Sequence, residues 1–231
     1  MSEQKTPHEQ VASPSFTLPT LDQEFLLGDS TRGIRFMLEY MKAEEHLREW
    51  GVRSTIVAFG SARVKEDDEG KRGHWYRSAR EIGRIVSERG GALDHDAELR
   101  DNVIATGGGP GIMEAANKGA FEAGAPSIGF NITLPHEQDP NAWSTPDLTF
   151  NFHYFAMRKM HLAMRANGLV VFPGGFGTMD ELFEILTLVQ TGKMSAIPIV
   201  LFDRDFWTRV VNLDVFVEAG TISAGDVNLF H

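Results

Sequence analysis

The chain has 231 residues, of which 42% are hydrophobic, which is enough for one sizeable α/β domain with an ordinary core. Its formal net charge of −10 argues against nucleic acid or an anionic membrane as a partner, because both favour basic patches. The sequence has no cysteine, which excludes disulfides and thiolate zinc sites. It also lacks an apolar run that could span a bilayer or act as a signal-peptide core, so we expect a cytoplasmic protein.

The beginning of the chain differs in composition from the rest. Residues 1–22 are rich in Ser, Thr, Pro and Gln without a sustained period, so we interpret residues 1–30 as a flexible N-terminal arm. Apolar residues then recur at helical spacing over residues 31–50, and Gly51 is placed to end this helix. Residues 31–231 are predicted to form a single α/β nucleotide-binding domain.

Short β-branched runs alternate with amphipathic stretches along this domain. We expect strands at residues 54–60, 102–106, 127–131, 148–152, 168–172 and 196–202. We expect helices at residues 75–89, 112–123, 155–166, 178–191 and 206–219, and a loop rich in Pro, Asp and Asn at residues 133–147. Strands that alternate with helices imply right-handed crossovers. The predicted fold class is therefore α/β, a Rossmann-like doubly wound and mostly parallel sheet with helices on both faces.

The most informative stretch is PGGFGTMDE, residues 173–181, between a predicted strand and a predicted helix. Glycines at such a turn let backbone N–H groups approach an anion, and the helix N-terminus adds the positive end of its dipole. Glu181 lies one turn into the helix, close to whatever a bound phosphate is attached to. A phosphate site with a nearby carboxylate and no P-loop lysine suggests chemistry on a phosphorylated sugar rather than phosphoryl transfer.

A second glycine turn, Gly107–Gly111, is explained equally well by the backbone needs of a tight turn. Both turns stand at the carboxyl ends of predicted parallel strands, where ligands of open α/β sheets collect, so both could contact one ligand. Neither turn nor Gly60–Arg63 matches the dinucleotide motif GxGxxG, and no GxxxxGK[ST] phosphate loop is present in the sequence. These mismatches argue against NAD-dependent and kinase-like chemistry, and no cofactor is expected.

Arg158 and Lys159 lie in the predicted helix before the main motif, among aromatic and apolar residues. A basic pair on a helix is ordinarily a solvated surface pair, but a guanidinium among such neighbours is suited to hold a phosphate or ribose oxygen. Arg63, after the first strand, is a weaker candidate of the same kind and better fits a surface or interface position. His153 and His161 do not share a helix face at ligand spacing, so no metal site is expected.

Residues 173–181 match PGGxGTxxE, the signature of the LOG ("Lonely Guy") family of nucleotide 5′-monophosphate phosphoribohydrolases. Gly107–Glu114 resembles the second signature of that family, and Met157–Met160 resembles its arginine–lysine helix. The resemblance extends over residues 54–202, which is most of the chain, whereas residues before 31 and after 203 have no clear counterpart.

The resemblance implies cleavage of the N-glycosidic bond of a nucleoside 5′-monophosphate, of the AMP or cytokinin riboside type, to a free base and ribose 5-phosphate. It assigns catalysis to Arg158 and Glu181, and the Glu181 carboxylate would stabilise an oxocarbenium-like transition state. The residues expected to cradle the 5′-phosphate are Gly174, Gly175, Gly177 and Thr178. The other expected substrate contacts are Ser61, Gly108, Gly109, Glu114 and Lys159.

Two other interpretations differ in class from this hydrolase. Proteins of this kind were long labelled lysine decarboxylases, but Lys159 is the only lysine near the glycine turns, and its neighbours do not form the Ser-x-His-Lys pattern of a pyridoxal-phosphate site. The alternative is a non-catalytic phosphate-, nucleotide- or molybdenum-cofactor-binding protein of the same fold, and the Glu181 carboxylate argues against it because a pure phosphate binder gains nothing from that charge. A nucleotide-sensing regulator with vestigial activity is not distinguished by sequence.

The expected partner is a small-molecule nucleotide substrate, with no nucleic acid and no membrane. Relatives with this fold form dimers with active sites near the interface, so the resemblance also implies a homodimer or a larger homo-oligomer. The helix at residues 31–50 could serve that contact, although core packing explains its apolar face equally well.

Overall fold

The structure is a computed structural model that describes residues 7–93, 98–135 and 139–231. The chain divides into two compact units, residues 1–42 and residues 43–231, and the boundary falls inside helix α3 (Arg32–Glu49). The prediction of a separate arm that ends at residue 30 stays a prediction. Residues 136–138 of the expected loop at 133–147 lie outside the described residues.

The first unit contains short helices that the sequence analysis did not predict. They are α1 (Pro7–Val11), α2 (Gln23–Leu27) and the 3₁₀ turns η1 (Pro14–Phe16) and η2 (Asp29–Thr31), followed by the first part of α3. The hydroxyl of Thr31 lies within hydrogen-bond distance of the carbonyls of Phe25 and Leu26, at 2.8 and 2.9 Å, and these carbonyls also accept from the Gly28 N–H and the Arg35 guanidinium. At the other end of α2 the Asp22 side chain accepts a hydrogen bond from the Phe25 N–H at 3.0 Å, so this helix of five residues is bonded at both ends.

The second unit is built on one sheet of six parallel strands. The strands are β1 (Thr55–Phe59), β2 (Val103–Thr106), β3 (Ser127–Ile132), β4 (Thr149–Phe152), β5 (Ala166–Val171) and β6 (Ile199–Leu201). Their order across the sheet is β4-β3-β2-β1-β5-β6, so the chain first winds outward from β1 to one edge and then returns to build the other side. The predicted doubly wound α/β fold is confirmed.

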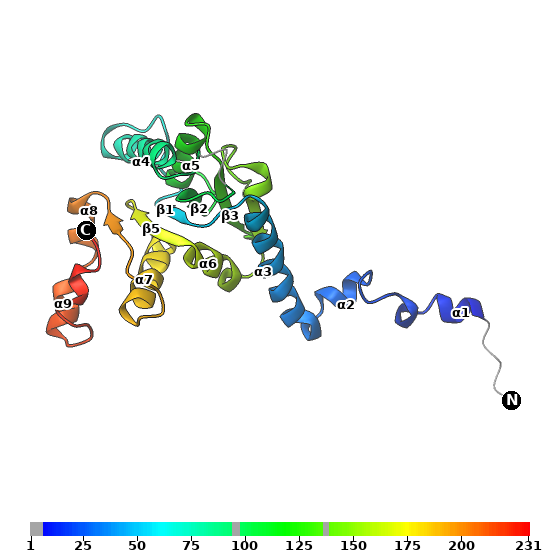
Figure 1. Cartoon of the computed structure of the whole chain (residues 1–231). Coiled ribbons are helices and arrows are strands. Elements are labelled where there is room, and N and C mark those ends of the chain that lie inside the picture. The colour runs from blue at the N-terminus through cyan, green and yellow to red at the C-terminus, as the bar shows by residue number, and fades with distance from the viewer. Residues whose placement is uncertain (1–6, 94–97, 136–138) are drawn as a thin grey trace. The chain divides into compact units, whose positions relative to one another are not determined.

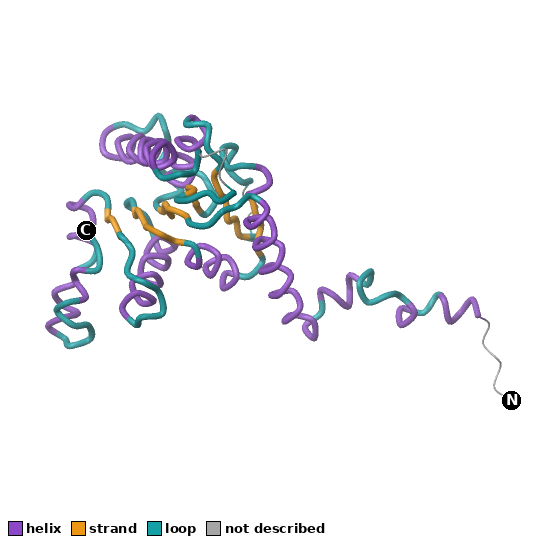
Figure 2. Tube along the Cα trace, viewed as in Figure 1, coloured by secondary structure: helices purple, strands orange, loops and turns teal. Residues whose placement is uncertain are grey.

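Helices cover both faces of this sheet. They are α4 (Gly70–Arg89), α5 (Ile112–Glu122), α6 (Phe155–Met164), α7 (Phe176–Gln190), α8 (Arg204–Val210) and α9 (Leu213–Glu218), with 3₁₀ turns η3 (Pro146–Leu148) and η4 (Asp226–Asn228). Figure 1 shows α4 and α5 on one side of the sheet and α6 and α7 on the other, and Figure 2 shows the strands as the layer between them.

Alternating side chains of each strand supply the two cores. On β1, Ile56 and Ala58 pack with the α5 residues Ala116 and Ala120. The intervening residues of β1 face the opposite side, where they join Leu162 of α6 and two α7 side chains in the larger cluster. Burial of one such Leu or Ile side chain stabilises the folded state by about 1.5–3 kcal/mol. Because both faces of β1 are buried in this way, the same strand holds both helix layers to the sheet.

The prediction of one helix over residues 206–219 is wrong. Val211 and Asn212 have extended backbones, with ψ angles of 114° and 93°, and they separate α8 from α9. Two β-branched residues followed by an asparagine explain this break, because asparagine favours helix N-caps over helix interiors. Among the helices in the described ranges, none has the length and apolar character needed to cross a membrane.

Candidate active site

The strand order creates a crevice beside β1. The strands β2 and β5 lie on opposite sides of β1, so the order of strands along the chain reverses direction there. Ligands of open α/β sheets bind outside the carboxyl ends of the strands at such a switch point. A cleft of about 560 Å³ lies there, lined by residues 59–63 at the end of β1 and in the loop after it, by residues 175–178 and 180–181 of the α7 region, and by Met113, Phe155 and Arg158.

Backbone hydrogen bonds join the three loops around this cleft. The Ser61 N–H donates to the Pro173 carbonyl at 3.0 Å, and the Ile112 N–H donates to the Ser61 carbonyl at 3.1 Å. Gly111 has a φ of +74°, and a Cβ at this position would lie 2.3 Å from the Ser61 carbonyl oxygen. The second glycine turn therefore has a firm structural reason, which is the close passage of the β1 loop.

The glycines of the main motif divide into two kinds. A Cβ at Gly174 would lie 2.1 Å from the Thr178 hydroxyl oxygen, so packing requires this glycine. A Cβ at Gly175 or Gly177 would meet nothing within 4 Å, and neither residue has a positive φ. Both line the cleft at the start of α7, where no side chain caps the helix. Their N-terminal turn therefore presents free N–H groups and open space to an anion.

A buried ion pair stands one turn further along α7. The Arg158 guanidinium donates from Nη1 to Glu181 Oε1 at 3.1 Å and from Nε to the Phe130 carbonyl at 2.8 Å. Only 8% of Arg158 and 5% of Glu181 is exposed. A Cβ at Gly107 would come within 2.5 Å of Arg158 Nη2, so this glycine makes room for the guanidinium.

Burial sets the protonation of this pair. Loss of solvent raises the pKa of Glu181 to about 7, although the positive charges of Arg158 and Lys159 oppose the shift. Burial also lowers the pKa of Arg158, against the attraction of Glu181. A carboxyl group that titrates near neutral pH in a cleft is suited to acid–base work.

The structure brings several of the predicted site residues to this one cleft, namely Ser61, Arg158, Gly175, Gly177, Thr178 and Glu181. Others make structural contacts and do not line it. The Asn141 side chain donates to the carbonyls of Gly108 and Gly109 at 3.1 Å each. The Tyr76 hydroxyl donates to Glu114 at 3.0 Å, and Gly174 packs under Thr178.

Lys159 faces the acidic side of α7 rather than the cleft. Its Nζ donates to Asp180 Oδ1 at 3.0 Å and lies 3.0 Å from Glu184 Oε2. Its ammonium group is therefore neutralised by two carboxylates, and its influence on the site is electrostatic.

Several cleft residues were not assigned to the site from sequence, among them Phe155, Phe176 and Met113. Phe155 precedes Arg158 by three residues on α6, so the helical period could have placed both on one face. Phe176 lies between two glycines of the motif, and this position in the sequence could have indicated it. Its side chain is 96% exposed, which is unusual for a large apolar residue. Met113 lies within the Gly107–Glu114 segment that resembles the second family signature, but its residue type did not single it out.

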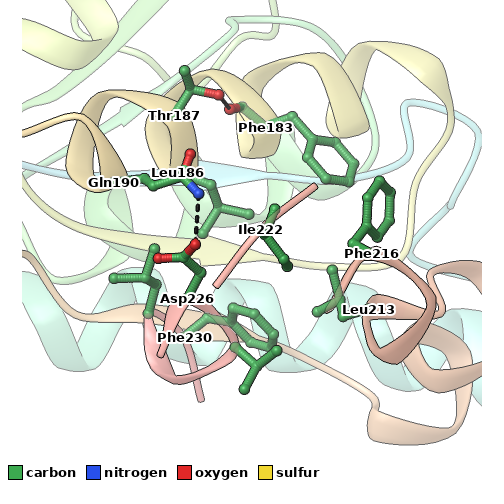
Figure 3. Close-up of a pocket in the computed structure, with 11 residues that line it drawn as sticks. Phe183, Leu186, Thr187, Gln190, Leu213, Phe216, Ile222, Asp226 and Phe230 are labelled. Carbon is green, nitrogen blue, oxygen red and sulfur yellow. Dashed lines mark hydrogen bonds between the residues drawn. The ribbon is translucent and has the colours of Figure 1, made fainter. Parts of the chain in front are cut away.

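A second cavity lies against the other half of α7. It has a volume of about 130 Å³, and its lining is mostly apolar, with Phe183, Leu186, Leu213, Phe216 and Phe230 among the residues drawn in Figure 3. Its main polar feature is the Gln190 amide, which donates to Asp226 at 2.7 Å. This pocket has the character of packing between α7 and the segment that follows α8.

The family described as "possible lysine decarboxylase" matches residues 113–231, which is just over half of the chain. The chain belongs to this family. The matched segment contains the PGGxGTxxE motif and the Arg158–Glu181 pair, and this is the LOG family that the sequence resembled.

Among curated LOG proteins, a rice (Oryza sativa subsp. japonica) protein named probable cytokinin riboside 5′-monophosphate phosphoribohydrolase LOG4 is 28% identical over 183 residues. That alignment covers 78% of this chain and 71% of the rice protein. Arabidopsis thaliana cytokinin riboside 5′-monophosphate phosphoribohydrolase LOG1 is 26% identical and covers 61% of this chain and 68% of its own.

Solved structures with a similar chain course include the molybdenum cofactor carrier protein of Chlamydomonas reinhardtii. It is 23% identical with a TM-score of 0.48, and the match covers 78% of this chain and 88% of that one. The molybdenum cofactor binding protein of Rippkaea orientalis is 18% identical with a TM-score of 0.46, covering 73% and 86%.

Proposed function

We propose that this LOG-family protein hydrolyses the N-glycosidic bond of a nucleoside 5′-monophosphate, of the AMP or cytokinin riboside type, and releases the free base and ribose 5-phosphate. The observation that carries the proposal is the buried Arg158–Glu181 pair, one helical turn beyond an open glycine turn. A buried ion pair contributes little to stability, because desolvation offsets the attraction between the charges. Its presence in a cleft therefore favours a chemical role.

The first turn of α7 is the proposed site of the 5′-phosphate. Gly175, Gly177 and Thr178 line the cleft there, and the two glycines leave open the space that side chains would occupy. Backbone N–H groups at a helix N-terminus bind an anion through hydrogen bonds and through the helix dipole. Binding energy from this remote group positions the sugar for reaction.

Glu181 is proposed as the catalytic carboxylate. Departure of the base develops positive charge at the anomeric carbon of the ribose, and a carboxylate close to that carbon stabilises it. The same group accepts a proton from the attacking water, whose oxygen forms the new bond to that carbon as the bond to the base breaks. The base leaves with the bonding electron pair and takes up that proton, directly or through solvent, which returns Glu181 to its carboxylate form. With a pKa near 7, Glu181 can be present both as the carboxylate that accepts the proton and as the acid that releases it.

Arg158 is proposed to bind substrate and to maintain the charge of Glu181. Its Nε is occupied by the Phe130 carbonyl and its Nη1 by Glu181, which fixes the plane of the guanidinium. The remaining N–H donors are available for a ribose hydroxyl or a phosphate oxygen.

The lysine chemistry in the family description does not fit these residues. Pyridoxal-phosphate decarboxylation requires a lysine that forms a Schiff base in the site. No lysine lines the cleft in the described structure, and Lys159 is held by Asp180 and Glu184.

The decisive experiment is incubation of the purified protein with a panel of nucleoside 5′-monophosphates, followed by chromatography of released base and assay of ribose 5-phosphate. We expect stoichiometric release of both products from at least one nucleotide, and much slower cleavage of the matching nucleoside. Binding of nucleotides without any base release would favour the non-catalytic alternative.

We also propose that the active form is a homodimer or larger assembly. Phe155 and Phe176 line the cleft and are 53% and 96% exposed, and Met164 at the far end of α6 is 49% exposed. Aromatic and Met side chains are enriched at interfaces. Light scattering tests this point, because a fully active particle with a mass near 25.7 kDa would contradict it.

A further inference from the structure

Arg63 combines a fixed backbone with an uncommitted side chain. Its N–H donates to the Ser61 hydroxyl at 3.1 Å, its carbonyl accepts a hydrogen bond from Arg72, and the next residue, Val64, is buried in the core. The Arg63 side chain is nevertheless exposed and lines the cleft. The loop therefore holds this guanidinium at the cleft without using it for packing.

The other charged side chains of the cleft are already paired. Arg158 is bound to Glu181, and Asp180 is bound to Lys159 from outside the cleft. Within the described ranges, Arg63 is the cleft cation that has no carboxylate within ion-pair distance. It is thus the positive charge that a ligand can use without breaking an existing pair.

The β1 loop places Arg63 beside the proposed phosphate site. The hydrogen bond from Ser61 to Pro173 ties this loop to the glycine turn before α7. Arg63 follows Ser61 by two residues, and Gly175 follows Pro173 by two residues, and both line the same cleft. The Arg63 loop and the α7 N-terminus therefore form adjoining walls of one cleft.

The charges of the site call for such a cation. A phosphate monoester carries a charge of about −1.5 to −2 at neutral pH, whereas a helix N-terminus supplies roughly +0.5. Asp180 and Glu181 line the same cleft and repel an anion. A free guanidinium can make up the difference and can bind phosphate oxygens in a two-pronged geometry.

We propose that Arg63 binds the phosphoryl group of the nucleotide together with the first turn of α7, and that it makes the cleft selective for phosphorylated ligands over nucleosides. This inference rests on the proposed position of the 5′-phosphate. It gives Arg63 a role in substrate binding that is separate from the catalytic role of Glu181.

The test compares Arg63→Gln with Arg63→Lys and with a matched control, Arg84→Gln. Arg84 lies on α4, pairs with Glu81 and Glu88, and does not line the cleft, so its substitution makes the same change in net charge and removes only ion pairs on α4. Calorimetry would measure ribose 5-phosphate binding to each full-length protein, and AMP and adenosine binding in a Glu181→Gln background. For Arg63→Gln we expect about tenfold to hundredfold weaker binding of ribose 5-phosphate and AMP, because a hydrogen-bonded charge is lost.

Adenosine affinity should stay the same in all variants, Arg63→Lys should recover part of the loss, and Arg84→Gln should bind like the wild type. The proposal is overturned if Arg63→Gln binds ribose 5-phosphate as well as the wild type does, or if the wild type binds neither phosphorylated ligand. Arg63-dependent phosphate binding without any nucleotide cleavage would instead support Arg63 and refute the proposed hydrolysis. Nucleotide cleavage with an unchanged KM in Arg63→Gln would support the proposed hydrolysis and refute the role of Arg63.

Discussion

The two halves of α7 border two cavities of opposite character. Its first residues, including Gly175, Thr178 and Glu181, line a polar cleft of about 560 Å³. Its second half, including Phe183 and Leu186, lines an apolar pocket of about 130 Å³. One helix therefore contributes the carboxylate of a buried charge pair at one end and ordinary hydrophobic packing at the other.

The difference shows how chemistry and stability are separated along one element. The helix N-terminus offers unpaired N–H groups and a positive dipole end, so anionic ligands and carboxylates are favoured there. The second half has satisfied backbone groups and contributes through apolar burial. Substitutions at the first end should mainly change turnover and binding, and those at the second should mainly change the free energy of unfolding.

The largest effect is expected for Glu181→Gln. Loss of the carboxylate charge should lower kcat by about 10²- to 10³-fold, which corresponds to about 2.7–4 kcal/mol of barrier, while nucleotide binding stays largely intact. The matched control is Glu184→Gln, which removes a carboxylate on the same helix that is outside the cleft. Steady-state kinetics and calorimetry on both variants test the role, and near-normal turnover of Glu181→Gln would refute it.

The next effect concerns the apolar end of the helix. Leu186→Ala should lower the free energy of unfolding by about 2 kcal/mol, because Leu186 lines the apolar pocket and the truncation enlarges it. For a protein of this size, the expected decrease in Tm is about 4–8 °C. Turnover per folded molecule should not change. A loss of activity at an unchanged Tm would show that the two ends of α7 are not separable in this way.

A smaller effect is expected from pH. The pKa of Glu181 is raised to about 7, and the proposed reaction needs the carboxylate form, so kcat/KM should decrease as the pH falls through this value. At pH 6 the rate should be about tenfold below its plateau, since one pH unit below a pKa leaves roughly a tenth of the group ionised. Protonation of the phosphate contributes near pH 6, so the pH dependence of AMP binding to Glu181→Gln serves as the control. A flat profile between pH 6 and 8 would contradict this role of Glu181.

The smallest effect is expected for Gly177→Ala. The added methyl group meets nothing within 4 Å, and alanine favours helix over glycine, so the free energy of unfolding should rise by up to about 1 kcal/mol. The KM for a nucleotide should rise as well, because the methyl group occupies space in the cleft. The matched variant Gly174→Ala should instead destabilise the protein, since its Cβ would lie 2.1 Å from Thr178 Oγ1. Thermal unfolding and kinetics of both variants check this contrast.

Most of the fold could be predicted from sequence because local signals agreed with tertiary structure. Strands such as Val103–Thr106 are continuous apolar runs, as expected for a parallel sheet that is covered on both faces. The signal failed at residues 206–219, where apolar periodicity continued across a break at Val211 and Asn212. Periodicity reports which face is buried, and it does not detect a short change in backbone direction within one buried surface.

The candidate site was predicted most directly where one segment held both the turn and the side chain, whereas Ser61 and Arg158, on other segments of the same cleft, were assigned through the family resemblance. Gly175, Gly177 and Glu181 belong to one contiguous motif, so their meeting at one cleft followed from the strand–turn–helix pattern. Gly108 and Gly109, whose role as ligand contacts stays a prediction, accept hydrogen bonds from Asn141, which lies about thirty residues further along the chain. Contacts between distant segments leave no local pattern, and for the same reason Arg63 was only a weaker candidate for the site, with a surface or interface position favoured.

The pairing of β1 with β5 has a consequence for folding during translation. Thr55–Phe59 pairs with residues 166–171, so the central strand acquires this neighbour only after β2, β3 and β4 have been made. At usual translation speeds the nascent chain waits on the order of ten seconds with that edge of β1 open, and an open apolar strand edge is a template for wrong pairing. The cleft needs both strands, so binding capacity emerges abruptly when β5 and α7 leave the ribosome. A chaperone that covers β1 during this interval would prevent wrong pairing at its open edge.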